Sequence, residues 1–197
     1  SVAIAGHDLK RILLPAVVAV LVFVGAALYF ARDSIALSLF RGASQDAIAN
    51  DIVATLPDGL IAGFCGTGSP LPDRERAGPC TAVVAGGQIF LFDVGEGAIE
   101  TLALMGLQPA HVEAVFLTHF HSDHIDGLGG LAVQRWATAA STAPLPLYGG
   151  EGVERLANGL REAYALDTTY RIAHHGAAVV PPGGEGYTAH PLTIPEG

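Results

Sequence analysis

Lysine is nearly absent from this 197-residue sequence, and positive charge of any kind is scarce. The chain has 10 Lys and Arg against 19 Asp and Glu, a formal net charge of −9 with His neutral. From residue 59 onward it has six Arg, no Lys and fourteen Asp or Glu. Nucleic-acid-binding proteins usually present a basic face that neutralises phosphates. The composition therefore argues against nucleic acid as a partner.

Cysteine is also scarce, with Cys65 and Cys80 as the only two. Two cysteines are too few for a framework of several disulfides. In an oxidising compartment they would pair; otherwise they would remain free thiols that act as small core residues. The sequence leaves both alternatives open.

Charged residues are missing altogether from residues 12–31. At about 1.5 Å per residue, a helix of this length crosses the hydrocarbon core of a membrane. A cleaved secretory signal is the alternative, with Lys10 and Arg11 as its basic start. The apolar run is longer than that of a usual signal, which favours an uncleaved anchor. Arg residues also follow the run, so charge barely decides its orientation; we expect the short N-terminus inside and the large domain outside the cytoplasm.

The chain is predicted to fall into four segments: an N-terminal flank (1–11), a transmembrane anchor or signal peptide (12–31), a helical connector (32–58) and a globular domain (59–197). Within the domain, hydrophobic periodicity predicts both strands and helices. Strands alternating with helices indicate an α/β layered fold, and the Pro- and Gly-rich stretch from residue 179 predicts loop. The predicted strands cover 60–65, 81–85, 88–93, 112–118 and 145–148, and the predicted helices cover 98–105, 127–139 and 151–165.

Residues 118–124, Thr-His-Phe-His-Ser-Asp-His, gather three histidines and one aspartate at the end of a predicted strand. Imidazole nitrogen and carboxylate oxygen suit Zn²⁺ and similar divalent ions. Because side chains alternate along a strand, His119 and His121 can share one ion, and the following turn can present Asp123 and His124 to another. Two ions roughly 3.5–4 Å apart can hold a hydroxide and stabilise a leaving oxygen. The motif therefore predicts a dinuclear metal-dependent hydrolase.

This motif resembles the His-x-His-x-Asp-His signature of the metallo-β-lactamase fold hydrolases. Residues 92–97, Phe-Asp-Val-Gly-Glu-Gly, resemble the superfamily's earlier strand end, and residues 66–70, Gly-Thr-Gly-Ser-Pro, resemble the opening loop of its ribonuclease Z and arylsulfatase-like branch. The agreement covers roughly residues 60–176. It implies a metallo-β-lactamase-like αββα sandwich, of which this α/β domain would hold the first half, preceded by an N-terminal transmembrane helix.

The resemblance also implies roles for individual residues. His119 and His121 would bind the first metal ion, and Asp123 and His124 the second. The two ions would be Zn²⁺, with Mn²⁺ or Fe²⁺ as alternatives, and Asp123 would also orient the attacking water as a catalytic general base. Asp93 would orient the ligands by hydrogen bonds without touching metal.

Candidate substrate-binding residues lie on either side of the motif. Arg74 and Arg76 follow the 66–70 loop, and guanidinium groups match phosphate or sulfate geometry. His174 and His175 are expected near the mouth of the site. Ordinary surface charge and loop imidazoles are the alternative for all four.

Part of the family's site is not found in this sequence. The family completes its metal site with a third His, a bridging Asp and a final His on later strands. The sequence ends at Gly197 in a loop-like stretch, and it lacks an initiator Met. We therefore expect a domain that is incomplete at its C-terminus, in a fragment of a longer chain.

The predicted function is metal-dependent hydrolysis of an anionic ester, either a phosphodiester or a sulfate ester, by a metal-bound hydroxide. The expected partners are a small anionic ester as substrate and a membrane through the N-terminal helix, and a homodimer is left open. The first alternative is a tRNA 3′-processing endoribonuclease of the ribonuclease Z type, against which the acidity and the expected export argue. An alternative of another class is a truncated, non-catalytic remnant with a partial metal site.

Overall fold

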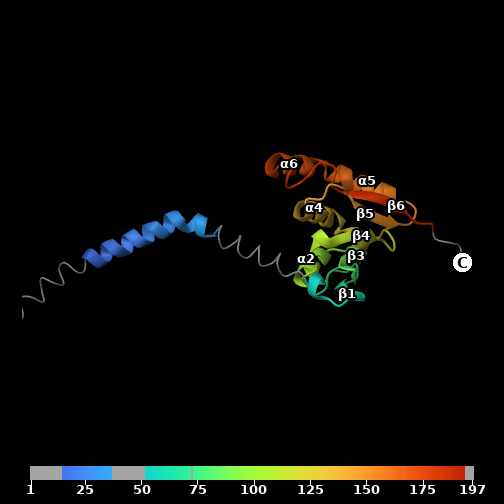
Figure 1. Cartoon of the computed structure of the whole chain (residues 1–197), viewed down its shortest axis with the longest axis horizontal. Helices are drawn as coiled ribbons and strands as arrows, with labels where there is room; N and C mark the ends of the chain where they lie inside the picture. Colours follow the sequence, from blue (N-terminus) through green and yellow to red (C-terminus); the bar gives the residue numbers. More distant parts are fainter. Residues whose placement is uncertain (1–14, 37–51, 72, 194–197) are drawn as a thin grey trace, which may run out of the picture. The chain divides into compact units, whose positions relative to one another are not determined.

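The computed structural model describes residues 15–36, 52–71 and 73–193, and the chain divides into two units, Ser1–Ala49 and Asn50–Gly197. The described part of the first unit is one long helix, Pro15–Ala36 (Figure 1). Its 22 residues have a hydropathy of 2.0 and none of it is buried. Length and composition suit a membrane span or a signal sequence equally. The helix runs five residues beyond the predicted span, while the predicted flank (1–11) lies outside the described residues.

The second unit is an α/β domain that begins with a short 3-10 turn, η1 (Val53–Thr55), where the sequence predicts the end of a helical connector. Most of that connector lies outside the described residues. The strands are β1 (Leu60–Gly66), β2 (Cys80–Ala85), β3 (Gln88–Phe92), β4 (Val112–Phe116), β5 (Leu145–Gly149) and β6 (Tyr187–Pro191). The helices are α2 (Ala98–Leu104), α3 (Ser122–Ile125), α4 (Leu128–Ala139), α5 (Val153–Ala163) and α6 (Ala165–His175), with a second 3-10 turn, η2 (Pro109–His111).

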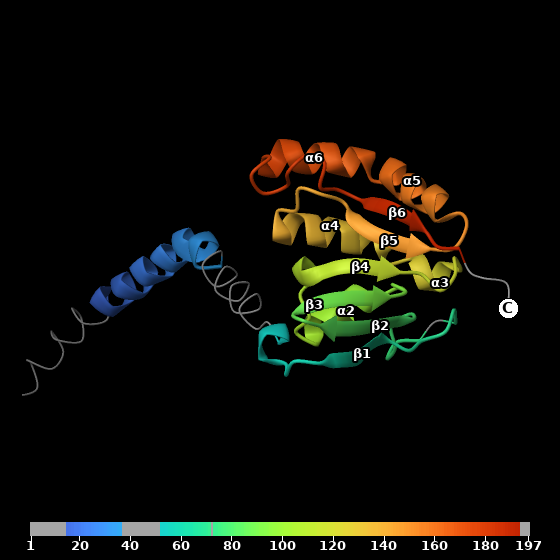
Figure 2. The same cartoon turned by 45° about the vertical axis from the view of Figure 1, so that its right-hand side comes forward.

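The strands form one mixed sheet in the order β1-β2-β3-β4-β5-β6. β1, β2 and β3 are antiparallel neighbours, whereas β3, β4, β5 and β6 are parallel. Crossovers between parallel strands are almost always right-handed, so strands added in one direction place their helices on one face. Figure 2 shows the sheet with α2 and α4 behind it. The domain is thus an α/β layer structure with one mixed sheet, the class that the sequence predicts.

The core lies between the sheet and its helices. In β2 the alternate residues Cys80, Ala82 and Val84 are buried, as expected for a strand with one covered face. The buried phenol of Tyr187 donates a hydrogen bond to the carbonyl of Leu128 at 2.7 Å. Burial raises the pKa of Tyr187, so its hydroxyl keeps the proton it donates. This bond ties β6 to the start of α4.

The loop prediction for the C-terminal stretch is wrong at β6. Glycines precede the strand and Pro191 ends it, so its local pattern is that of a loop. Pairing with β5, from Leu145↔Tyr187 to Gly149↔Pro191, makes it a strand, because the neighbouring strand satisfies its backbone hydrogen bonds. The helix predicted over 151–165 is confirmed as α5, which covers Val153–Ala163. A further helix that the sequence analysis did not predict, α6, follows it over Ala165–His175.

The other face of the sheet carries a row of stacked aromatic rings. Phe92, Phe116, Tyr148 and His190 occupy paired positions on β3, β4, β5 and β6. Their ring centroids are 5.1, 4.8 and 4.7 Å apart along the row. Cross-strand aromatic pairs stabilise a sheet, and here they join the four parallel strands whose ends carry the candidate site.

Candidate metal centre

The histidine motif begins where β4 ends. β4 stops at Phe116, residues 117–121 form a short connection, and α3 starts at Ser122. Leu117 N–H donates to the carbonyl of Tyr148 at 2.8 Å, so the segment stays attached to β5. Figure 2 shows α3 beyond the carboxyl end of β4. This edge of a parallel sheet is where α/β proteins commonly bind ligands.

The three motif imidazoles lie together. The ring centroid of His119 is 4.5 Å from that of His121 and 4.1 Å from that of His124. His124 Nε2 lies 3.6 Å from a carboxylate oxygen of Asp123. The structure therefore brings together the four residues that the sequence predicts as metal ligands.

Asp93 follows β3 immediately and contacts this cluster through His124. Its backbone has φ 60°, a left-handed conformation that the short polar side chain of Asp tolerates. The side chain is only 8% exposed and accepts a hydrogen bond from His124 Nδ1 at 2.8 Å. It also accepts from Thr118 N–H at 2.9 Å and from the Thr118 hydroxyl at 2.7 Å. This placement is the one expected of a residue that orients ligands, and its role stays a prediction.

Thr118 is a site residue that the sequence analysis did not single out. Its side chain joins Asp93 to the motif, although the two residues are 25 positions apart. The available signal was its place immediately before His119. No local pattern distinguishes a hydroxyl that contacts a carboxylate from one that faces solvent.

Glycines allow three loops to meet behind the motif. Val94 N–H donates to the carbonyl of His124, and Gly127 N–H donates to the carbonyl of Val94, both at 2.9 Å. A Cβ added to Gly95 would collide with the carbonyl oxygen of Asp123 and with the backbone of Gly78. The position of the Asp123 backbone therefore depends on a glycine at position 95.

Gly95→Ala is expected to destabilise the domain by about 1–3 kcal/mol, since the added methyl meets backbone that has no free space to move into. Gly159→Ala is the matched control. Gly159 lies inside α5 with nothing within 4 Å of an added Cβ, so alanine should stabilise by up to about 1 kcal/mol. Urea unfolding of both variants measures the difference; equal stability of the two would contradict the close backbone packing.

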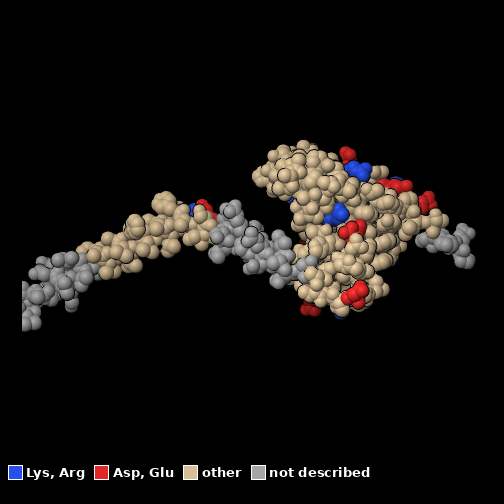
Figure 3. Space-filling view, viewed as in Figure 1, with Lys and Arg blue, Asp and Glu red and all other residues tan. Residues whose placement is uncertain are grey.

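A cleft of about 600 Å³ opens beside Asp123. Ser122 and Asp123 line one side of it, and the predicted substrate-binding residues Arg74 and Arg76 line another. Carboxylates outnumber the two guanidinium groups in the cleft, which is also lined by Asp73, Glu75, Glu96, Asp123 and Asp126. Figure 3 shows one face of the molecule, where charges of both signs are scattered without a continuous basic patch.

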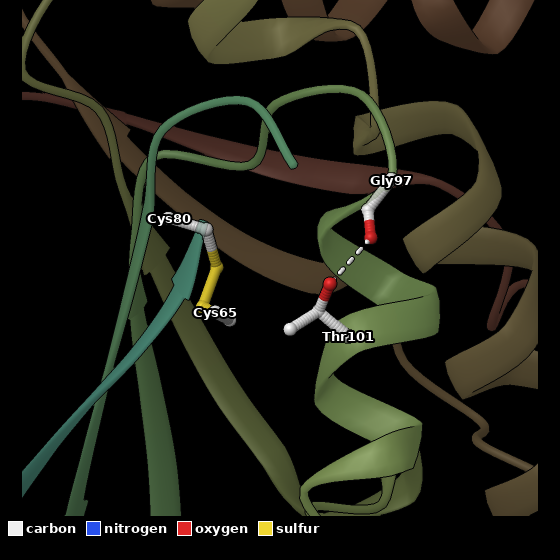
Figure 4. Close-up of a disulfide and its surroundings, with 4 residues drawn as sticks. All are labelled: Cys65, Cys80, Gly97 and Thr101. Carbon is white, nitrogen blue, oxygen red and sulfur yellow. Dashed lines mark hydrogen bonds between the residues drawn. A yellow bond between two sulfur atoms is a disulfide. The ribbon is translucent and has the colours of Figure 1, made fainter. Parts of the chain in front are cut away.

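The loop that carries the two arginines is joined at its ends by a disulfide. Cys65 and Cys80 are paired across 15 positions, with Cα atoms 4.9 Å apart, which removes the free-thiol alternative. Figure 4 shows the disulfide between β1 and β2, together with the first turn of α2, where the Thr101 hydroxyl donates to Gly97 O at 3.1 Å. The disulfide thus anchors both ends of the loop formed by residues 66–79.

His174 and His175 lie in the last turn of α6. Figure 2 shows α6 and α3 toward opposite ends of the sheet. The structure therefore does not bring these two histidines to the motif, whereas Arg74 and Arg76 reach the cleft beside it. Substrate binding by any of the four stays a prediction.

The donor atoms suit a divalent metal ion, but they do not form a finished coordination shell. Among the described residues, no group of three or more His, Cys, Asp or Glu side chains is arranged to hold a metal ion. The chemistry of the set still fits, since imidazole and carboxylate are the ligands that zinc takes in hydrolases. His124 donates a hydrogen bond from Nδ1 to Asp93. The lone pair that could bind a metal ion is therefore on Nε2.

Comparison with known proteins identifies the class. The family profile of the Metallo-beta-lactamase superfamily matches residues 73–193, a stretch that contains the motif, Asp93 and most of the cleft wall. The chain belongs to the metallo-beta-lactamase superfamily.

Several similar curated proteins are named ribonuclease Z. Ribonuclease Z of Mycobacterium bovis (strain BCG / Pasteur 1173P2) is 47% identical over 130 residues, covering 64% of this chain and 46% of the relative. Ribonuclease Z of Mycobacterium marinum is 47% identical over 119 residues, covering 59% and 43%. Human tRNase Z, short form, has a similar structure, with a TM-score of 0.50 and 27% identity over 66% of this chain and 43% of that one. The chain is thus a ribonuclease Z homologue that spans about half the length of the curated relatives it matches.

Proposed function

We propose that this domain forms the metal-binding part of a ribonuclease Z-type enzyme, which hydrolyses an RNA phosphodiester at the 3′ end of tRNA precursors. The observation that carries the proposal is the 47% identity to proteins named ribonuclease Z. The clustered motif above Asp93 supports it, because phosphodiester hydrolysis requires a site that collects cationic groups around the reacting phosphate.

Each residue of the site has its own proposed role. His119, His121, Asp123 and His124 would hold divalent metal ions, most simply Zn²⁺. A bound pair of ions would supply Lewis acidity and an acidified water at this edge of the sheet. Asp123 would orient that water and accept its proton, since its carboxylate faces both the motif and the cleft. Arg74 or Arg76 would contact the phosphate from the opposite wall.

A second candidate keeps the chemistry and changes the substrate to a small anionic ester outside the cytoplasm. Three observations favour it: the paired cysteines, the carboxylates that outnumber arginines in the cleft and the apolar helix Pro15–Ala36. Disulfides persist in oxidising compartments. Under this reading the helix is a membrane anchor or an export signal, and the domain lies outside the cytoplasm.

Turnover of three substrates by the purified chain, with added Zn²⁺ or Mn²⁺, separates the two candidates. Cleavage of a tRNA precursor at its 3′ trailer, with little turnover of bis-p-nitrophenyl phosphate, supports the ribonuclease Z-type proposal. Turnover of bis-p-nitrophenyl phosphate or p-nitrophenyl sulfate without cleavage of the precursor supports the second candidate. Failure on all three substrates, with metal bound, would overturn both as activities of this chain and would favour the truncated, non-catalytic remnant.

A further inference from the structure

Thr118 occupies a position between one buried carboxylate and one motif histidine. Its hydroxyl oxygen lies 2.7 Å from Asp93 Oδ2 and 3.0 Å from His119 Nδ1. Both distances are those of hydrogen bonds. The hydroxyl carries one hydrogen atom and therefore donates only one of the two bonds.

The direction of both bonds follows from the acceptor. The Thr118 hydroxyl donates to Asp93 Oδ2, since a carboxylate oxygen is the acceptor in this contact. In the contact at 3.0 Å, Thr118 Oγ1 is left as the acceptor, and the hydrogen comes from His119 Nδ1. A neutral imidazole that is protonated at Nδ1 has its free electron pair on Nε2.

Asp93 also fixes the tautomer of His124, here by a direct hydrogen bond with no residue between the two. Its Oδ2 accepts from His124 Nδ1 at 2.8 Å, which also leaves Nε2 of that ring free. One carboxylate therefore selects the tautomer of both rings, directly for His124 and through a hydroxyl for His119.

We propose that Thr118 is a positioning residue that links Asp93 to His119 by two hydrogen bonds. It thereby holds the proton of His119 on Nδ1 and leaves the lone pair of Nε2 available to bind a metal ion. The tautomer assignment stands on the hydrogen bonds alone; its consequence for metal binding rests on the proposed function. Thr118 also has a backbone role, because its N–H donates a hydrogen bond to Asp93 Oδ1 at 2.9 Å. The side-chain role is separable, because valine keeps the backbone bond and the shape of threonine while losing the hydroxyl.

The test uses Thr118→Val and Thr118→Ser, with Thr138→Val as the matched control. Thr138 Oγ1 donates to Gln134 O on the exposed surface of α4, so this control makes the same change of side chain and loses a hydroxyl that does not contact Asp93. The first readout is the ¹⁵N NMR spectrum of the metal-free histidine rings, which distinguishes a protonated from a bare nitrogen. We expect His119 to be protonated at Nδ1 in the wild type, Thr118→Ser and Thr138→Val, and to become a mixture of tautomers in Thr118→Val.

The second readout is Zn²⁺ affinity by titration, expected to fall about 10–100-fold in Thr118→Val, the usual cost of losing a group that orients a ligand. Serine should restore the affinity. His119 remaining protonated at Nδ1 in Thr118→Val would overturn the inference, as would wild-type affinity in a variant whose tautomer has changed. If the wild type binds no Zn²⁺ and cleaves no phosphodiester while valine still shifts the tautomer, the proposed function fails and the positioning role is upheld.

Discussion

Replacement of His121 by alanine is expected to reduce metal-dependent phosphodiester hydrolysis by about 10³-fold or more. Loss of a metal ligand removes several kcal/mol of stabilisation of transition-state charge, and about 4 kcal/mol corresponds to about 10³-fold in rate. His121 is exposed, immediately before α3. Its removal therefore takes away a donor without opening a cavity in the core, and the fold should be retained.

Three measurements support the interpretation of this variant. Circular dichroism should show the wild-type helix content, metal analysis should show a lower zinc content, and kcat/KM should fall with both candidate substrate types. Thr138→Val, on the exposed face of α4, serves as the control with wild-type turnover. Retained activity in folded His121→Ala would refute the assignment of this residue as a ligand.

Removal of the disulfide, by Cys65→Ala combined with Cys80→Ala, is expected to destabilise the domain by about 3 kcal/mol. The disulfide closes a loop of 15 positions, and cross-linking a loop of that length lowers the entropy of the unfolded chain by about this amount. For a domain of this size the melting temperature should fall by roughly 10 °C. Differential scanning calorimetry measures both values.

Proteolysis tests whether the same disulfide orders the wall of the cleft. Trypsin cleaves after arginine, and the loop of residues 66–79 contains Arg74 and Arg76. Cleavage there should be faster in the double variant than in the wild type, and a reductant should accelerate it in the wild type only. An unchanged melting temperature together with an unchanged cleavage rate would show that β1 and β2 hold the loop without the disulfide.

The state of the cysteines also bears on the substrate. A domain that needs its disulfide would be expected in an oxidising compartment, where Pro15–Ala36 would act as an anchor or an export signal. Such a location separates the site from tRNA precursors in the cytoplasm and favours the small anionic ester. A domain indifferent to reduction would remove this argument and favour the ribonuclease Z-type reaction.

Much of the fold was predictable from the sequence because its elements have local signatures. The span of apolar residues and the helical spacing in α5 depend on neighbours a few positions away. The histidine motif is equally local, since its four candidate ligands lie within six residues. The sequence by itself therefore determined the superfamily, the α/β class and the place of the site at the end of β4.

Only the tertiary structure decided the features that depend on distant partners. β6 is a strand because β5 pairs with it, and Tyr187 reaches Leu128 across 59 positions. Cys65 meets Cys80 because β1 and β2 are antiparallel neighbours. The contact between Asp93 and His124 spans 31 positions. Hydrogen bonds and packing act through space, whereas a sequence pattern records only neighbours along the chain, so the choice of donor atom in the motif became visible only once β3 and β4 lay side by side.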